Sequence, residues 1–205
     1  MTKESSVKRA YEKIKRCIKQ IFDAAFPFID NYLKNKKLSK KYPQSILDGI
    51  ENSDAIGIDT LKGQYADTMH TKDKLEDKAK ISIIGITIAI TLITGASGIL
   101  MVLYEKYPCS IFSWIGFFLY IGAEIYLISG GILAIKVLFD ENKISIIELS
   151  SYAAGESTLR DDYDKCISNN RIQNLIRNNS IYTSYECIRN ALICIFIVFF
   201  ITAIP

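Results

Sequence analysis

Three strongly apolar runs divide this chain, and the first two predict a pair of membrane-spanning helices. Residues 81–103 (ISIIGITIAITLITGASGILMVL) carry no formal charge. A helix of that length reaches about 34 Å at about 1.5 Å per residue, which is enough to cross a hydrocarbon core of about 30 Å. Residues 111–139 form a second run of sufficient length, interrupted only by Glu124 and Lys136. Because only residues 104–110 separate the two runs, we expect an antiparallel hairpin.

A third apolar run covers residues 191–205 (ALICIFIVFFITAIP). By itself it gives a helix of about 22 Å, shorter than the hydrocarbon core. Extending the helix back to residue 181 adds Tyr182 and Tyr185, which suit a membrane interface, and Arg189, whose long side chain can reach the headgroups. We therefore predict a third membrane helix over 181–205. The alternative is an apolar tail that packs against the hairpin or lies in the interface.

Residues 1–58 predict a basic amphipathic helical region in the cytoplasm. Between residues 7 and 25, apolar side chains recur at steps of three and four, on the face opposite several Lys and Arg. The apolar members are Val7, Ala10, Tyr11, Ile14, Cys17, Ile18, Ile21, Phe22 and Ala25. Such a helix can lie on an anionic leaflet, or its apolar face can pack on the protein's other helices. Pro27 should end or kink it. Residues 34–41 (KNKKLSKK) then predict a solvated basic turn, and residues 45–54 a short helix.

Residues 59–80 predict a charged helical stalk that runs directly into the first membrane helix. The inward-facing positions follow the heptad spacing of a coiled coil. These positions are Leu61, Tyr65, Thr68, Lys72, Leu75, Ala79 and Ser82. Residues 159–176 carry an imperfect helical stripe and should run back along the stalk. The expected fold is therefore all-α, with a membrane hairpin, a third C-terminal membrane helix and a cytoplasmic helical layer.

We accordingly divide the chain into four regions. Residues 1–58 form the basic region, and 59–139 the stalk with spans at about 81–103 and 111–139. Residues 140–180 form a cytoplasmic helical segment, and 181–205 the third membrane segment.

Lysine and arginine set the expected orientation. Residues 1–80 contain seventeen of them, and Lys72, Lys74, Lys78 and Lys80 lie just before the first span. Since positively charged flanks stay in the cytoplasm, we expect a multi-pass protein of the cell inner membrane with its N-terminus and residues 140–180 cytoplasmic. The whole chain of 205 residues carries a net charge of only +3, which gives no support to nucleic-acid binding.

Composition and motifs argue against an enzyme. The chain is 49% hydrophobic, with a mean hydropathy of +0.16, 11 Gly, 4 Pro and 5 Cys, which excludes a collagen, a disulfide scaffold and a wholly disordered chain. It holds a single His, and it lacks a P-loop, G-x-G-x-x-G, G-x-S-x-G, H-E-x-x-H and C-x-x-C. We predict no catalytic residue, no cofactor and no metal site.

Glu124 is the residue within the membrane for which we expect a function. It lies near the middle of the second apolar run, where an ionised carboxylate costs about 2.5–3.5 kcal/mol on insertion scales. One interpretation is a pore-lining or proton-linked group. The other is a hydrogen-bonded packing contact to Thr87, Thr91 or Thr94 on the first span.

Small residues along both spans would let helices approach closely. The helix-packing candidates are Gly85, Gly95, Gly98, Gly122, Gly130 and Gly131. So many small residues in two spans also suit a homo-oligomer in the lipid bilayer.

The order of these elements resembles a known family. Residues 65–93 (YADTMHTKDKLEDKAKISIIGITIAITLI) form a charged helix that runs into an apolar span. A very short link follows, then a second span ending in GGILAIKVLF (130–139), then NNRIQ (169–173) and NNSIYTSYECIRNA (178–191) before the last apolar run. In these features residues 60–205 resemble the SLATT-type and Pycsar-type small membrane effectors of prokaryotic antiviral defence. Residues 1–58 add a basic helix that the simplest members lack.

The resemblance implies an effector of a bacterial anti-phage, abortive-infection system. Such an effector oligomerises and perturbs or permeabilises the inner membrane when a nucleotide-sensing or nucleotide-synthesising partner protein triggers it, and it has no catalytic residue. Two other functions fit the sequence. One is a non-enzymatic membrane scaffold or accessory subunit that recruits a cytoplasmic partner. The other is a small ion channel or transporter component in which Glu124 couples ions.

Overall fold

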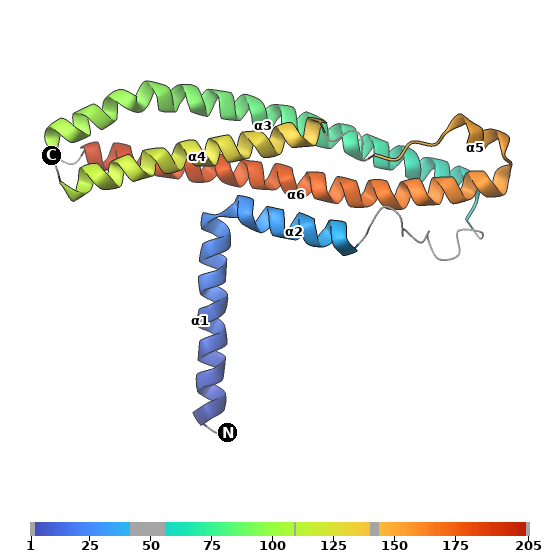
Figure 1. Ribbon diagram of the computed structural model, residues 1–205, viewed down its shortest axis with the longest axis horizontal. Coiled ribbons are helices and arrows are strands. Elements are labelled where there is room, and N and C mark those ends of the chain that lie inside the picture. Colours follow the sequence, from blue (N-terminus) through green and yellow to red (C-terminus); the bar gives the residue numbers. More distant parts are fainter. Residues whose placement is uncertain (1–2, 42–55, 109, 140–143, 204–205) are drawn as a thin grey trace.

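Three long helices lie side by side and form the body of the protein (Figure 1). The computed structural model describes residues 3–41, 56–108, 110–139 and 144–203, and these residues form helices and short connections without a strand. The long helices are α3 (Ile58–Lys106), α4 (Ile111–Phe139) and α6 (Glu156–Ala203). The short α5 (Leu149–Ala153) precedes α6 at one end of the bundle.

Each long helix contains one of the three apolar runs and is long and apolar enough to span a membrane. The prediction of an all-helical chain with three such segments is confirmed. Helix α4 coincides with the second run, whereas α3 and α6 are 49 and 48 residues long and continue well beyond theirs. The boundary that we placed at residues 180/181 therefore falls inside one uninterrupted helix, α6.

The bundle has two halves, named here by the part of α3 that they contain. The polar half contains residues 58–80 of α3, and the apolar half contains residues 81–106. In the polar half, Leu61 is fully buried among Leu159, Tyr163 and Ile167 of α6. Leu75 and Ala79 pack further along with Ile181 and with Val137 of α4. The heptad spacing thus identified the buried face of α3.

Two polar segments differ from their predicted structure. Residues 34–41 belong to the helix α2 (Pro27–Lys41) instead of forming a turn, because lysine is a good helix former and nothing in the segment breaks a helix. The connection after α4 lies against the polar half, where the backbone N–H of Ser145 donates to Oδ1 of Asn170 at 2.8 Å. The short helix predicted at 45–54 lies outside the described residues.

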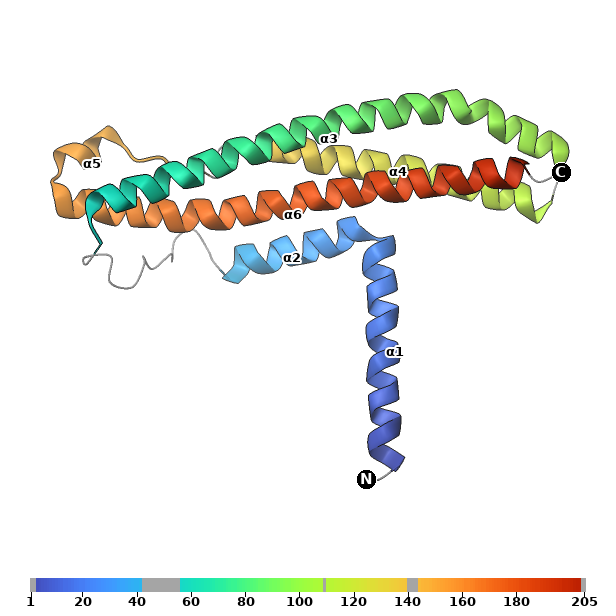
Figure 2. The ribbon, with the colours of Figure 1, turned by 180° about the vertical axis from the view of Figure 1, so that it is seen from behind.

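The two N-terminal helices form an arm on the bundle. Helix α1 (Lys3–Ala25) ends two residues before Pro27, and α2 then packs along α6 while α1 runs away crosswise to the bundle (Figure 2). Proline supplies no N–H and has a φ that suits the first position of a helix, which explains the start of α2 there.

A layer of small residues joins the three helices where the two halves meet. The hydroxyls of Ser82 on α3 and Ser184 on α6 lie 2.6 Å apart, and the Ser184 hydroxyl donates to the backbone oxygen of Gly130 on α4 at 2.9 Å. A Cβ atom on Gly130 would lie 3.1 Å from Cβ of Cys187 and 3.3 Å from the Ser184 oxygen. Only glycine allows α4 and α6 to approach this closely.

We expect Gly130→Ala to destabilise the folded protein by about 1–3 kcal/mol, because the added methyl group overpacks a tight contact. Gly122→Ala is the matched control, since a Cβ at Gly122 meets no atom within 4 Å. Denaturation of the purified variants in detergent, followed by circular dichroism, measures both. Equal stabilities of the two variants would contradict this account of the Gly130 contact.

Candidate functional site

The apolar half presents large apolar side chains on its outside. Ile84, Leu92, Phe118 and Phe196 each expose about three fifths or more of their surface. Patches of this size are rare on soluble monomers, and a helical bundle in lipid requires them. Tyr104 and Trp114 are exposed near one end of the spans, in keeping with an interfacial aromatic belt.

One exposed side of α3 differs from the rest of this surface because its residues are small and polar. We name it the threonine–glycine face; it consists of Thr87, Thr91, Thr94, Gly95 and Gly98. All five residues are exposed, and a Cβ on either glycine would meet nothing within 4 Å. Three pairs of these residues are four positions apart, namely Thr87 and Thr91, Thr91 and Gly95, and Thr94 and Gly98. This spacing follows the small-xxx-small pattern of close helix contacts in membranes. Each threonine hydroxyl donates to the carbonyl four residues earlier, at 2.9–3.0 Å.

Glu124 is partly buried near the middle of α4, a helix long and apolar enough to span a membrane. Its carboxylate interacts with the hydroxyl of Tyr120 one turn earlier on the same helix. The contacts of Gly131 with Ile86, and of Gly116 with Leu103, set the antiparallel register of α4 against α3. This register places Glu124 at about the depth of the threonine–glycine face. One interpretation of Glu124 was a hydrogen bond to Thr87, Thr91 or Thr94. These three hydroxyls donate to carbonyls of their own helix, and none of the hydrogen bonds described joins them to Glu124.

The glycines singled out from the sequence fall into two groups. A Cβ on Gly130, Gly85 or Gly131 would touch another helix, at Cys187, Ile188 and Ile86 respectively. A Cβ on Gly95, Gly98 or Gly122 would meet open space. The first group serves packing within the bundle, and the second leaves room for another molecule.

A buried polar layer between α3 and α6 escaped the sequence analysis. The inward-facing side of α6 carries polar residues over four turns, namely Asn169, Asn170, Gln173, Asn174, Arg177, Ser180, Thr183 and Ser184. Asn174 donates to the backbone oxygen of Thr68 at 2.8 Å, and Arg177, 3% exposed, pairs with Glu76 at 3.1 Å. The signal was available: positions 163, 167, 170, 174, 177, 181 and 184 continue a four–three spacing, but hydrophobicity alone does not reveal it.

Burial governs the ionisation of two phenols at the far end of the polar half. The hydroxyls of Tyr163 and Tyr152 lie 2.9 Å apart, and burial raises the pKa of Tyr163 to about 12. The ring of Tyr65 meets that of Tyr163 edge-on, and burial raises the pKa of Tyr65 as well. Both phenols stay neutral near pH 7, so they pack and form hydrogen bonds but do not exchange protons there.

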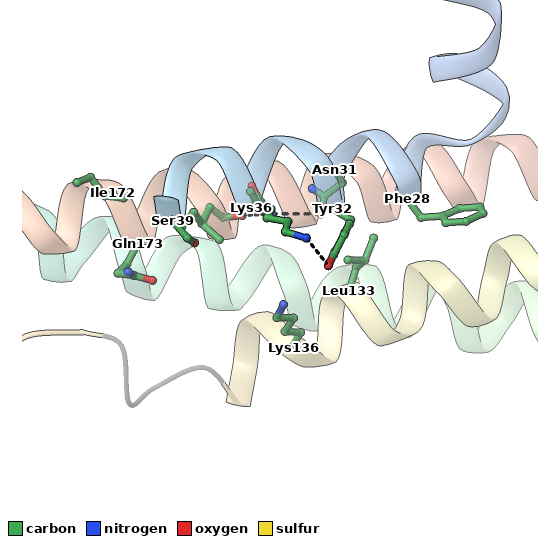
Figure 3. Close-up of a pocket in the computed structure, with 11 residues that line it drawn as sticks. Phe28, Asn31, Tyr32, Lys36, Ser39, Leu133, Lys136, Ile172 and Gln173 are labelled. Atoms are coloured by element: carbon green, nitrogen blue, oxygen red, sulfur yellow. Dashed lines mark hydrogen bonds between the residues drawn. The ribbon is translucent and has the colours of Figure 1, made fainter. Parts of the chain in front are cut away.

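A cavity of about 440 Å³ lies between α2, α4 and α6 (Figure 3). Lys36 of α2 and Lys136 of α4 line it, together with the buried Asn31, and its described lining contains no Asp or Glu. Lys136 extends from α4 toward α2, while the amine of Lys36 contacts the hydroxyl of Tyr32. Two cations beside amide groups and apolar walls can hold a small anion.

In comparisons with known proteins, no family model, no curated protein and no solved structure matches the chain. Within the described residues, no group of three or more His, Cys, Asp and Glu is arranged to hold a metal ion. A proposal for the function therefore rests on the threonine–glycine face, on Glu124 at about the same depth of α4, and on the buried polar layer.

We expect Glu76→Gln to destabilise the protein by about 3 kcal/mol, because Arg177 then keeps its charge in a buried site after losing its carboxylate partner. Asp77→Asn is the control: Asp77 pairs with Lys80 in water, where such a pair contributes at most about 1 kcal/mol. Urea titration in mild detergent compares the two variants. A Glu76 variant as stable as the Asp77 variant would show that the buried pair does not hold α3 to α6.

Proposed function

We propose that this chain is a membrane effector of a bacterial anti-phage, abortive-infection system. In this proposal the protein spans the inner membrane three times with its polar half in the cytoplasm. It assembles into homo-oligomers and perturbs or permeabilises the membrane when a nucleotide-signalling partner triggers it.

The observation that carries the proposal is the threonine–glycine face. In a lipid bilayer, helices associate through small residues that allow close backbone approach and through hydroxyls that can bond across the contact. Among the described residues of one copy, none packs against this face, so it can receive the same face of another copy. Its position on the outside of α3 favours assembly by lateral contact of bundles.

The length of α3 and α6 supports a signalling role. Both helices run without a break from the polar half into the apolar half, so a displacement at one end is carried along a stiff rod to the other. The polar layer between them is held by hydrogen bonds and an ion pair, which can be exchanged for other polar contacts more readily than a close-packed apolar core. A partner that binds the polar half can in this way alter how the spans meet.

Glu124 supplies the polar group that a permeable assembly needs. It lies on α4 at about the depth of the threonine–glycine face of α3 and is only partly buried, so an assembly of several copies holds several carboxylates at one depth. Carboxylates collected around an assembly attract cations and water into a region that lipid otherwise fills.

We expect overexpression in bacteria to stop growth and collapse the membrane potential, measured with a potential-sensitive dye. Gly98→Leu and Thr91→Leu should relieve both effects, because a bulky side chain blocks the close contact. Glu124→Leu should relieve permeabilisation while leaving association intact, as measured by crosslinking in membranes.

Gly122→Leu is the matched control for Gly98→Leu, since both glycines face open space but lie on different helices. It should leave association and toxicity unchanged. Growth arrest with an undisturbed membrane potential would argue against the proposal. Harmless overexpression together with a stably bound cytoplasmic partner would support a scaffold instead.

A further inference from the structure

Helix α1 has an amphipathic surface that no other part of the described structure covers between Glu12 and Phe22. Every side chain from Glu12 to Phe22 is exposed, and Ile14, Ile18 and Ile21 expose 59%, 62% and 70% of their surfaces. The sequence left two roles open for this helix: lying on an anionic leaflet, or packing on the protein's other helices. In the described structure, the exposed apolar face does not pack on the other helices. An apolar face of this size requires another occupant.

The charges around that face identify the kind of occupant. Ile14, Ile18, Ile21 and Phe22 share one side of the helix, as their spacing of three and four residues requires. Lys15 and Lys19 lie toward one edge of this side and Lys13 toward the other, whereas Arg16 lies on the opposite side of the helix. Cations on both flanks of an apolar strip match a surface that is apolar in depth and negatively charged on top, which is the surface of an anionic leaflet.

The base of α1 lies at the depth where the last apolar run of α6 begins, beside the middle part of α4. The side-chain amide of Asn190 donates to the backbone oxygen of Ala24 at 2.8 Å, and the hydroxyl of Tyr126 donates to that of Ala25. Asn190 directly precedes the last apolar run of α6, which starts at Ala191. The arm is therefore anchored where α6 changes from polar to apolar.

The direction of α1 agrees with this depth. The three long helices run together along the bundle, and both views show α1 crosswise to them (Figures 1 and 2). If the long helices cross a membrane, a helix that leaves them crosswise runs parallel to the membrane plane. Its apolar side can then enter the boundary between headgroups and acyl chains, and its lysines can reach the phosphates.

We infer that α1 is an interfacial helix that binds the anionic phospholipids of the leaflet on the side of the polar half. A second copy of the chain fits this face less well, because the flanking lysines of two such helices would repel each other. The inference needs the three helices to be membrane-embedded, but it does not depend on toxicity, on oligomers or on a trigger.

Cys17 offers a probe on the edge of the apolar face. It is exposed, whereas Cys166 and Cys187 are buried, and burial raises the pKa of the Cys166 thiol to about 11. In the full-length protein carrying Cys109→Ser and Cys194→Ser, an environment-sensitive fluorophore at neutral pH should therefore label Cys17 selectively. The labelled protein is reconstituted into vesicles of phosphatidylcholine, with or without phosphatidylglycerol.

In vesicles that contain phosphatidylglycerol, the emission should shift to shorter wavelength and be quenched by lipids carrying a spin label on the acyl chain. Ile18→Asp should abolish the shift, and Gln20→Asp, which adds the same charge on the other side of the helix, should preserve it. Neutralising Lys13, Lys15, Arg16 and Lys19 to Gln should remove the difference between the two lipid compositions.

Emission that stays water-like in anionic vesicles would overturn the inference. So would a blue shift that spin-labelled lipids do not quench, because the probe would then be covered by protein, such as α1 of another copy. Since these substitutions lie on an exposed helix, each variant should fold, and circular dichroism in detergent verifies this.

Discussion

A polypeptide that enters hydrocarbon must satisfy its backbone hydrogen bonds internally, because lipid offers no partner for an N–H or a carbonyl. This constraint accounts for the long, unbroken α3 and α6. Each passes from a charged part into an apolar part, and neither is interrupted at the change. In a membrane, a break there would leave backbone groups without partners. The same continuity joins the two halves of the bundle into one mechanical unit.

What varies along the bundle is the chemistry that holds the helices together. Leu61 and Ile167 form an apolar contact at the far end of the polar half, whereas Asn174 and Arg177 contribute hydrogen bonds and an ion pair further along. At the border, Ser82, Ser184 and Gly130 bring three helices into close contact. Deeper still, the contact is apolar again, around Ile86, Ala123 and Ala191. The polar layer thus lies between two apolar ones.

The outside of the bundle carries the features that one copy does not use. The threonine–glycine face has the composition of a helix contact and no contact partner, and α1 holds an apolar face away from the bundle. The first suits another protein helix, because its residues are small and close packing of small residues stabilises helix contacts in lipid. The second suits lipid, because its residues are large and are bordered by cations.

Periodicity in the sequence determined much of this protein. The lengths of the apolar runs indicated three helices able to span a membrane, and the heptad spacing from Leu61 to Ser82 indicated the buried face of α3. Both follow from local chemistry, because the rise of a helix and the position of its side chains do not depend on the rest of the chain. Only the tertiary structure decided which polar residues are buried, where Glu124 lies, and that α1 stays apart from the bundle. Asn174 and Arg177 are buried because Thr68 and Glu76, more than a hundred residues earlier, supply their partners. A hydrophobic pattern read along one segment carries no information about partners supplied by another.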